Sequence, residues 1–341
     1  MRLGYGLCTA AVIAFCAGGV AHAAGPVPVK VMIVSMFGPE AETWRSHRDL
    51  RNLTVVPGLP ADQPAVHCGQ DGVCQVTTGM GYANASASIA ALVYSRQFDL
   101  RQTYWLVAGI AGIDPHRGTL GSAAWARYLV DFGLQWELDE REAPKDWPTG
   151  FLGINTKNPG EKPRLEYGTE VFKLDDRLLQ RALALSKDVR LSDSPEAQKA
   201  RAVYPSAPAN QPPSVIQCDT LSSDTWFAGA RLSERASVWA KQLTDGHAVA
   251  CTTQQEDNAT YTVLQRAATA GLVDVRRVAV LRSGSDFSQS PPGGNDADTL
   301  LNYQVAGGFV PALANLYLAG NPLVQEIVGH WPAWRGGVPS P

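Results

Sequence analysis

Charged side chains are scarce in this sequence, and they do not gather into blocks. Asp, Glu, Lys and Arg make up 18% of the 341 residues, and the formal net charge is −3. A basic stripe or a polybasic tail is the electrostatic footprint of a protein that binds nucleic acid or an anionic membrane surface, and the sequence has neither. Nucleic acid is therefore not expected among its partners. The 45% of hydrophobic residues is enough to build a buried core.

Clusters of metal ligands and long hydrophobic runs are missing too. The six His residues are scattered, and no spacing of Cys and His resembles a zinc site. After residue 24, no stretch approaches the roughly 18 consecutive apolar residues that a membrane-spanning helix needs. We expect no metal site and no membrane span in the mature chain.

The N-terminus has the pattern of a secretory signal peptide. Arg2 supplies a short positive region, residues 7–20 form an apolar run rich in small residues, and residues 21–23 (AHA) fit an A-x-A cleavage site. Residues 1–23 are therefore predicted to be removed by cleavage near Ala23–Ala24, which makes the protein secreted or periplasmic. A buried N-terminal helix is the alternative interpretation.

Four of the six cysteines follow this segment: Cys68, Cys74, Cys218 and Cys251. Export permits disulfides. Residues 68–74 (CGQDGVC) have the pattern of a hairpin whose two strands could be clipped together, whereas Cys218 and Cys251 could pair or remain buried thiols. Four cysteines allow three pairings, and the sequence does not choose among them.

Short apolar runs that end at glycine turns alternate with helical patterns along the chain. Strands are predicted at residues 29–37, 73–78, 103–108, 215–218, 248–253 and 278–281. Helices are predicted at residues 83–95, 174–187, 231–243 and 305–318, together with one that is capped by Asp257 or Asn258 and stops at Gly271. The alternation predicts the α/β class, with a partly parallel sheet. Residues 24–341 are expected to form one domain with long loop insertions near 140–165 and 190–214.

Polar residues and glycines stand just past the ends of these strands, where ligands bind in open α/β sheets. They are Glu40, the segments Thr78–Gly81 and Gly109–Gly112, the pair Glu256 and Asp257, and the pair Ser285 and Asp286. Each of them taken alone also fits a turn glycine, a helix cap or a solvated acid. Five such groups in the same position along successive strands favour a shared site.

The order of short motifs gives this pattern a family resemblance. Residues 77–85 (TTGMGYANA) resemble the S-G-I-G-K-x-x-A segment of methylthioadenosine/adenosylhomocysteine nucleosidases, and residues 107–113 (VAGIAGI) resemble their N-T-G-x-A-G-G turn. Residues 255–260 (QEDNAT) stand where M-E-x-x-A is expected, and residues 282–286 (RSGSD) resemble R-x-I-S-D. The chain thus resembles the nucleoside phosphorylase superfamily over roughly residues 29–135 and 214–290, and it looks most like the purine nucleoside permeases.

The resemblance implies a three-layer sandwich, with a central mixed β-sheet flanked by helices, that binds a purine nucleoside. Glu40 would be the general base and Glu256 would accept hydrogen bonds from the ribose hydroxyls. Asp286 would donate to, or hydrogen-bond with, N7 of the purine, with Ser285 or Arg282 orienting it. Such a role requires a raised pKa for Asp286, which burial could supply. The resemblance implies no cofactor.

Two further groups of residues are assigned to substrate binding by the same resemblance. The backbone is expected to approach the sugar closely at Thr78, Gly79, Gly81, Gly109 and Gly112. The segment 217–227 aligns with the base-recognition stretch of the family, where the candidates are Asp219, Ser222, Asp224 and Trp226. The ring of Trp226 could stack on the purine or belong to the core.

The chain departs from the family pattern at several positions. Asp257 directly follows Glu256, which leaves open which of the two acids holds the ribose. Ile110 and Gly284 replace the usual residues of their motifs. The arginine-bearing phosphate loop of true phosphorylases is absent from the first strand, so hydrolysis is favoured over phosphorolysis and phosphate is left open as a second ligand.

Two functions follow from these observations. The first is an exported purine nucleosidase that cleaves the N-glycosidic bond during uptake or salvage. The alternative is a non-catalytic nucleoside-binding component of transport, since a pore needs spanning segments that the sequence lacks. A scaffold without a ligand site fits less well because the acids are all retained. Related enzymes assemble into dimers, trimers or hexamers, so a homo-oligomer is implied but its size is not.

Overall fold

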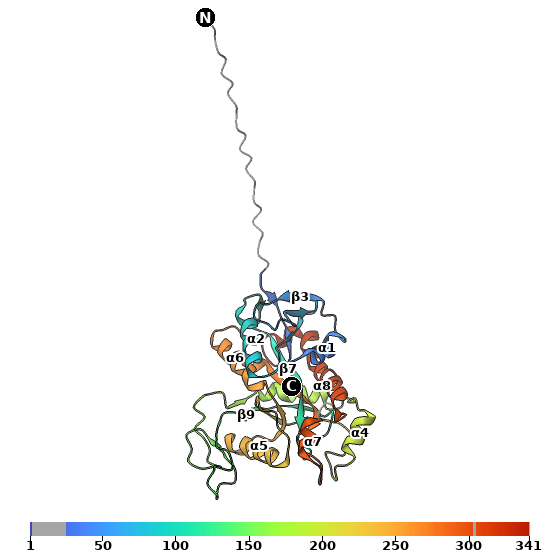
Figure 1. The fold of residues 1–341 in the computed structure, drawn as a ribbon. Coiled ribbons are helices and arrows are strands. Elements are labelled where there is room, and N and C mark those ends of the chain that lie inside the picture. The colour runs from blue at the N-terminus through green and yellow to red at the C-terminus, as the bar shows by residue number, and fades with distance from the viewer. Residues whose placement is uncertain (2–24, 303–304, 341) are drawn as a thin grey trace.

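A large mixed β-sheet runs through the molecule and carries helices on both of its faces (Figure 1). The computed structural model describes residues 1, 25–302 and 305–340. The predicted signal peptide, residues 1–23, therefore lies almost wholly outside the described residues. Helices α2 (Tyr82–Tyr94) and α6 (Asp257–Thr269) pack on one face of the sheet, and α1 (Gly38–Arg45), α3 (Asp176–Ser186) and α8 (Phe309–Gly329) pack on the other. The predicted α/β architecture is confirmed.

Twelve strands within the described residues form this sheet, and nine of them follow the order β12-β9-β14-β15-β7-β2-β5-β4-β3. Their bounds are β2 Val31–Ser35, β3 Asn52–Val55, β4 Ala65–Cys68, β5 Val73–Thr77, β7 Tyr104–Ile113, β9 Tyr128–Asp131, β12 Val171–Lys173, β14 Asp219–Ser222 and β15 Ala250–Gln254. The other three are β8 (Ala123–Trp125), β13 (Val215–Gln217) and β16 (Val278–Phe287), and β16 pairs with β7 along most of its length. The core strands β2, β5 and β16 are buried at every position, as expected for a sheet covered on both faces.

The remaining elements are short except for α5, which packs on a separate core cluster with its residues Ala236, Trp239 and Leu243. They are β1 (Val27–Pro28), β6 (Phe98–Asp99), β10 (Gln135–Glu137), β11 (Phe151–Gly153), α4 (Pro195–Arg201), α5 (Ala230–Leu243), α7 (Asp296–Leu301), α9 (Trp331–Trp334) and a 3-10 turn at Val275–Arg277. The predicted loop near 140–165 contains β11. The predicted loop near 190–214 is wrong in part because it contains α4, whose first residue is Pro195 and whose N-terminus is capped by the Ser194 hydroxyl.

Two predicted strands end too early. Gly109–Gly112 was expected to be a turn after the third strand, but β7 continues through it to Ile113. Likewise β16 continues through Arg282, Ser285 and Asp286 to Phe287. The two extensions pair with each other as parallel strands, with a shift in register between Gly284 and Asp286. Glycine has a low intrinsic preference for strands, so the local sequence predicts a turn here. Pairing with the neighbouring strand holds the segment extended.

Two helix boundaries also differ from the prediction. Neither Asp257 nor Asn258 caps α6, because Glu256 occupies the N-cap position and makes no side-chain cap there. Helix α8 extends to Gly329 and contains Pro322, whereas the sequence predicted an end at residue 318. Its buried side chains keep the helical spacing past the proline, at Leu323 and Ile327. None of the helices within the described residues combines the length and apolar character needed to cross a membrane.

Two disulfides settle the cysteine pairing that the sequence left open. Cys68 and Cys74 join the antiparallel strands β4 and β5, as the hairpin pattern indicated. The second disulfide joins Cys218, which directly precedes β14, to Cys251, the second residue of β15. The second bridge therefore ties together the two strands that lead to Ser222 and Glu256.

Candidate functional site

Two halves of the sheet meet end to end beside the middle of β7. Strand β2 runs parallel to the first half of β7, with Val34 opposite Val107. Strand β15 runs antiparallel to the second half of β7, with Thr253 opposite Gly112. The carboxyl ends of β2 and β15 therefore point toward each other across Gly109–Gly112. Ligands of open α/β sheets bind outside the carboxyl ends of strands, so the facing ends of β2 and β15 mark a candidate site.

Glu40 enters this junction from the β2 side. It lies in the first turn of α1, where its Oε2 accepts a hydrogen bond from the Met36 N–H at 2.7 Å and its Oε1 accepts one from the Ile110 N–H at 2.8 Å. Its side chain is buried, and burial raises its pKa to about 8, against the opposing effects of Arg282 and of the two backbone donors. Glu40 is thus a fixed carboxyl group that changes protonation near neutral pH.

Glu256 and Asp257 enter from the β15 side, and both bind Arg282. The Nη2 of Arg282 lies 3.1 Å from Glu256 Oε2 and 2.5 Å from Asp257 Oδ1. Burial raises the pKa of Glu256. Burial alone would lower the pKa of Arg282, but the Asp257 and Glu256 carboxylates hold it above its ordinary value. Arg282 also donates from Nη1 to the Ile110 carbonyl at 3.2 Å, so its guanidinium connects both sides of the junction.

Gly109 leaves the space in which these groups approach one another. A Cβ placed on it would lie 2.6 Å from Arg282 Nη1 and 2.8 Å from Glu40 Oε1, and it would overlap the Met36 side chain. Only glycine fits at this position without displacing the cluster. The groups that approach the backbone closely at Gly109 are therefore side chains of the protein itself, whereas the sequence predicted the sugar of a ligand.

The segments after β5 and β14 also face each other at the junction. The N–H of Gly81, in a left-handed conformation (φ 88°), donates to Glu256 Oε1 at 3.2 Å. The N–H of Tyr82 donates to Asp224 at 2.8 Å, and the Tyr82 hydroxyl oxygen lies 3.0 Å from the Ser222 carbonyl oxygen. Acceptors from the other half of the sheet thus satisfy the free N–H groups at the start of α2.

Asp286 lies further along β16, beside Gly112. A Cβ on Gly112 would lie 3.4 Å from Asp286 Oδ2 and 2.8 Å from the Thr253 hydroxyl oxygen. The Ser285 hydroxyl donates to Asp286 at 2.7 Å. Burial raises the pKa of Asp286 to about 7, against the opposing effect of that hydrogen bond. Asp286 lies four positions after Arg282, roughly 13 Å along an extended strand, so the site has two ends.

The space beside Thr253 is small. Two cavities of about 10 Å³ each adjoin Thr253, and both are lined by Leu221 and Phe227. The second is also lined by Phe132 and Trp226. Sites for small molecules usually measure roughly 300–1,000 Å³. Aromatic side chains therefore fill much of the space beside Thr253, and Thr253 itself lies next to Gly112, the ladder partner of Asp286.

The structure does not bring every predicted residue to this junction. Asp219 lies at the beginning of β14, and its carboxylate accepts hydrogen bonds from the N–H groups of Arg127, Tyr128 and Val249. This end of β14 is opposite to the end that carries Ser222. The Thr78 hydroxyl is turned to the Gly79 carbonyl at 2.8 Å, so the part of this segment that reaches the acids is Gly81.

Sequence reasoning missed several residues that build the site. Tyr82 connects α2 to the other half of the sheet, since its hydroxyl donates to Asp131 at 2.6 Å. Thr253 lies between Gly112 and the small cavities, and Phe132 and Phe227 have their ring centroids 5.4 Å apart. Tyr82 directly follows the glycines of the predicted segment, which is a signal that could have found it. The other three depend on strand pairing that the sequence does not specify.

Comparisons by sequence match nearly the whole chain. A model of the family described as purine nucleoside permease matches residues 28–339. A protein of Schizosaccharomyces pombe named a probable purine nucleoside permease is 41% identical over 320 residues, which cover 89% of this chain and 90% of that protein. A purine nucleoside permease of Candida albicans is 38% identical over 307 residues, which cover 89% of this chain and 75% of the relative.

Comparisons by structure match the same region to nucleosidases. The 5′-methylthioadenosine/S-adenosylhomocysteine nucleosidase from Neisseria meningitidis, in complex with methylthio-immucillin-A, matches with a TM-score of 0.51 at 13% identity and covers 87% of this chain and 99% of its own. The futalosine hydrolase of Helicobacter pylori matches with a TM-score of 0.53 at 14% identity and covers 87% and 98%. The predicted nucleoside-phosphorylase-like fold is thereby confirmed, and at these identities the likeness concerns the fold alone.

Proposed function

The chain belongs to the purine nucleoside permease family, and from this premise we propose that it binds a purine nucleoside at the junction around Arg282 and so contributes to nucleoside uptake. The observation that carries the proposal is the convergence of Glu40, Glu256 and Asp257 on one buried guanidinium, at the point where the strands change direction. Glu40 and the adjacent pair Glu256 and Asp257 come from distant parts of the chain.

The charge of the cluster favours a neutral ligand that is rich in hydroxyl groups. Three carboxyl groups surround the single positive charge of Arg282, so a further anion would be repelled. Glu256 accepts one hydrogen bond at Oε1 from Gly81 and retains lone pairs for others. The 2′- and 3′-hydroxyls of a ribose are donors suited to this carboxylate. In this arrangement the sugar lies between Glu40 and Glu256.

The base then lies toward Asp286. A carboxyl group whose pKa is about 7 can either donate a hydrogen bond to a purine ring nitrogen or accept one from it near neutral pH. A small cavity at Thr253, which adjoins this end through Gly112, is lined by the rings of Phe132, Trp226 and Phe227, and these rings can cover the faces of the base. Because the cavities there are small, ligand entry requires the segment that follows β14, residues 223–229, to move outward.

Cleavage of the glycosidic bond is the second function we propose for the same site, because two buried carboxyl groups change protonation near neutral pH at its opposite ends. Glu40 would take a proton from water as the water oxygen bonds to C1′ of the sugar. The C1′–N9 bond breaks, its electrons pass into the purine, and Asp286 gives a proton to N7. The products are the free base and ribose. General acid–base assistance of this kind contributes about 10²–10⁴-fold.

A product assay distinguishes the two functions. The protein would be incubated with adenosine or inosine, with and without phosphate, and the free base, ribose and ribose 1-phosphate would be measured. Free base and ribose formed without phosphate support hydrolysis, and ribose 1-phosphate formed only with phosphate would contradict it. Binding of 9-deazaadenosine, whose carbon–carbon bond between sugar and base cannot be hydrolysed, without turnover of adenosine supports the binding protein. Absence of both binding and turnover would contradict the proposed function.

Export completes the proposal. The signal peptide predicted from residues 1–23 would place the nucleoside site outside the cytoplasm, where a nucleoside is met before uptake. Edman sequencing of the protein recovered from the producing cells checks this point. A mature N-terminus near Ala24 is expected, and a chain that still begins at Met1 would contradict export.

A further inference from the structure

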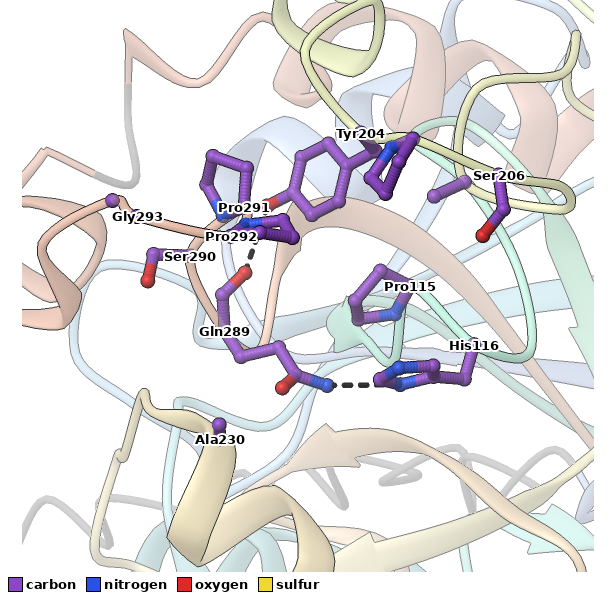
Figure 2. Close-up of a pocket in the computed structure, with 13 residues that line it drawn as sticks. Pro115, His116, Tyr204, Ser206, Ala230, Gln289, Ser290, Pro291, Pro292 and Gly293 are labelled. Atoms are coloured by element: carbon purple, nitrogen blue, oxygen red, sulfur yellow. Dashed lines mark hydrogen bonds between the residues drawn. The ribbon is translucent and has the colours of Figure 1, made fainter.

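A larger cavity, of about 310 Å³, lies where β7 and β16 leave the sheet. Its walls come from residues 115–116 after β7, residues 204–206 with Ala209, Ala230 at the start of α5, and residues 289–294 after β16. Figure 2 shows these segments gathered around one space. The volume reaches the lower end of the range for small-molecule sites, roughly 300–1,000 Å³. None of the residues around Arg282 lines it.

Side chains that contain rings form much of its wall. Tyr204 and four prolines, at positions 115, 205, 291 and 292, line the cavity. Tyr204 is held in place because its hydroxyl donates to the Gln289 carbonyl at 2.7 Å and its ring lies 4.2 Å from the ring of Phe287. A fixed aromatic ring among proline rings offers a face against which a planar ligand can stack.

The polar group of the cavity is the carboxamide of Gln289. Only 7% of this residue is exposed. Its amide nitrogen lies 3.3 Å from Asp114 Oδ1 and 3.1 Å from His116 Nδ1, and Figure 2 shows the nitrogen directed at His116. Within the part of the chain that the structure describes, the amide oxygen has no hydrogen-bond partner, so it can accept one from a ligand. No Asp, Glu, Lys or Arg lines the cavity, which favours an uncharged ligand.

This cavity adjoins the base end of the proposed site. Gln289 follows Asp286 by three residues, and Phe287 between them packs against Tyr204. One of the two small cavities beside Thr253 is lined by Asp114 and Ser288, the chain neighbours of Pro115 and Gln289. Along β7 and β16, the order is therefore the acid cluster, Asp286, a small cavity, and then the larger cavity.

We infer that the larger cavity is an outer capture site for the base of a purine nucleoside, distinct from the site at Arg282. The ring of the base lies against Tyr204, and an N–H on its edge donates to Gln289 Oε1. The amide oxygen suits this role because it accepts a hydrogen bond from an amino group or ring N–H, while the amide nitrogen stays with Asp114 and His116. The ligand class rests on the proposed function, whereas the existence of a second site rests on the cavity.

Equilibrium dialysis with 9-deazaadenosine tests the inference through the number of equivalents bound. The native chain is expected to bind two equivalents. Ser206→Trp, which fills the cavity from its rim, is expected to bind one, and Gln289→Met is expected to weaken one binding event about tenfold through the loss of one hydrogen bond. Ser46→Trp and Gln265→Met, at exposed positions on other surfaces, are the matched controls and should bind like the native chain.

A variant of the inner site separates this inference from the proposed function. Glu256→Gln is expected to weaken the binding of 9-deazaadenosine at the Arg282 site and to leave its binding at the outer site unchanged. If Ser206→Trp and Gln289→Met both bind as the native chain does, or if the native chain binds one equivalent that Glu256→Gln removes, the capture site is overturned while the proposed function stands. If Glu256→Gln changes nothing but Ser206→Trp removes one equivalent, the proposed function fails while the capture site stands.

Discussion

Glu256 accepts a hydrogen bond from the backbone N–H of Gly81 at 3.2 Å, although 175 residues separate the two in the chain. Gly81 follows β5 in one half of the sheet and Glu256 follows β15 in the other. The contact therefore closes the junction at which the proposed nucleoside site lies. It also means that the site forms only when both halves of the sheet have folded against each other.

Removal of the Asp257 carboxylate is expected to destabilise the fold strongly. Asp257→Ala removes one of the carboxylates that balance the buried positive charge of Arg282. The loss of one partner from a buried ion pair costs about 3–5 kcal/mol. Urea denaturation followed by circular dichroism measures the free energy of unfolding. Asp176→Ala is the control, because its ion pair with Lys173 is half exposed and contributes little. Equal losses in both variants would contradict the role assigned to Asp257.

Substitution of Gly109 is expected to disrupt the site. In Gly109→Ala the new methyl group would meet Arg282, Glu40 and Met36, and overpacking of this kind costs about 1–3 kcal/mol. Binding of 9-deazaadenosine should weaken at least tenfold. Gly329→Ala is the matched control, since nothing lies within 4 Å of a Cβ at that position. A Gly109→Ala protein with native affinity would show that ligand binding does not need the close approach of Arg282 and Glu40 to this strand.

Stability is expected to fall as the pH rises from about 4 to 8. The pKa of Asp286 rises from 3.8 to about 7 on folding, and that of Glu40 rises from 4.5 to about 8. A raised pKa means that the folded state holds the proton more tightly. The stabilising contribution is therefore complete below the ordinary pKa and is lost as the pH passes through the folded value. Asp286→Asn, which cannot ionise, should reduce by a few kcal/mol the difference in unfolding free energy between pH 5 and pH 9. An unchanged difference would contradict the raised pKa.

Glu40 is expected to affect turnover more than binding. If the protein cleaves nucleosides, Glu40→Gln should lower kcat by about 10²–10⁴-fold, with affinity for 9-deazaadenosine changed only a few-fold. Glu42→Gln, on the exposed side of the same helix, is the control. Because the base needs to be ionised and the acid protonated, the activity of the native protein should peak between pH 7 and 8, between the pKa values of Asp286 and Glu40. Unchanged turnover in Glu40→Gln would remove Glu40 from the mechanism.

The order of elements could be predicted from the sequence because each strand is an apolar run with a turn signal behind it. The strand that carries Val31–Ser35 and the helix that begins after Gly81 were found within a residue or two. Motif order also placed Glu40, Glu256 and Arg282 in one site, and the structure brings them together.

What the sequence could not supply depends on contacts between distant segments. The continuation of β7 through Gly109–Gly112 is enforced by pairing with β16, not by the local preference of glycine. The family resemblance made Asp219 a candidate for base recognition, but its carboxylate is used by three backbone N–H groups at the far end of the strand. The cavity beside Gln289 joins four segments, and its outline exists only in three dimensions.

A crystal structure of the protein with 9-deazaadenosine tests the central claim most directly. We predict a ribose whose hydroxyls lie within hydrogen-bonding distance of Glu256, with Glu40 facing C1′ and the base beside Asp286. The claim would be contradicted by a structure in which Arg282 keeps its ion pair with Glu256, Glu40 keeps its bonds to the Met36 and Ile110 N–H groups, and the ligand lies nowhere near them.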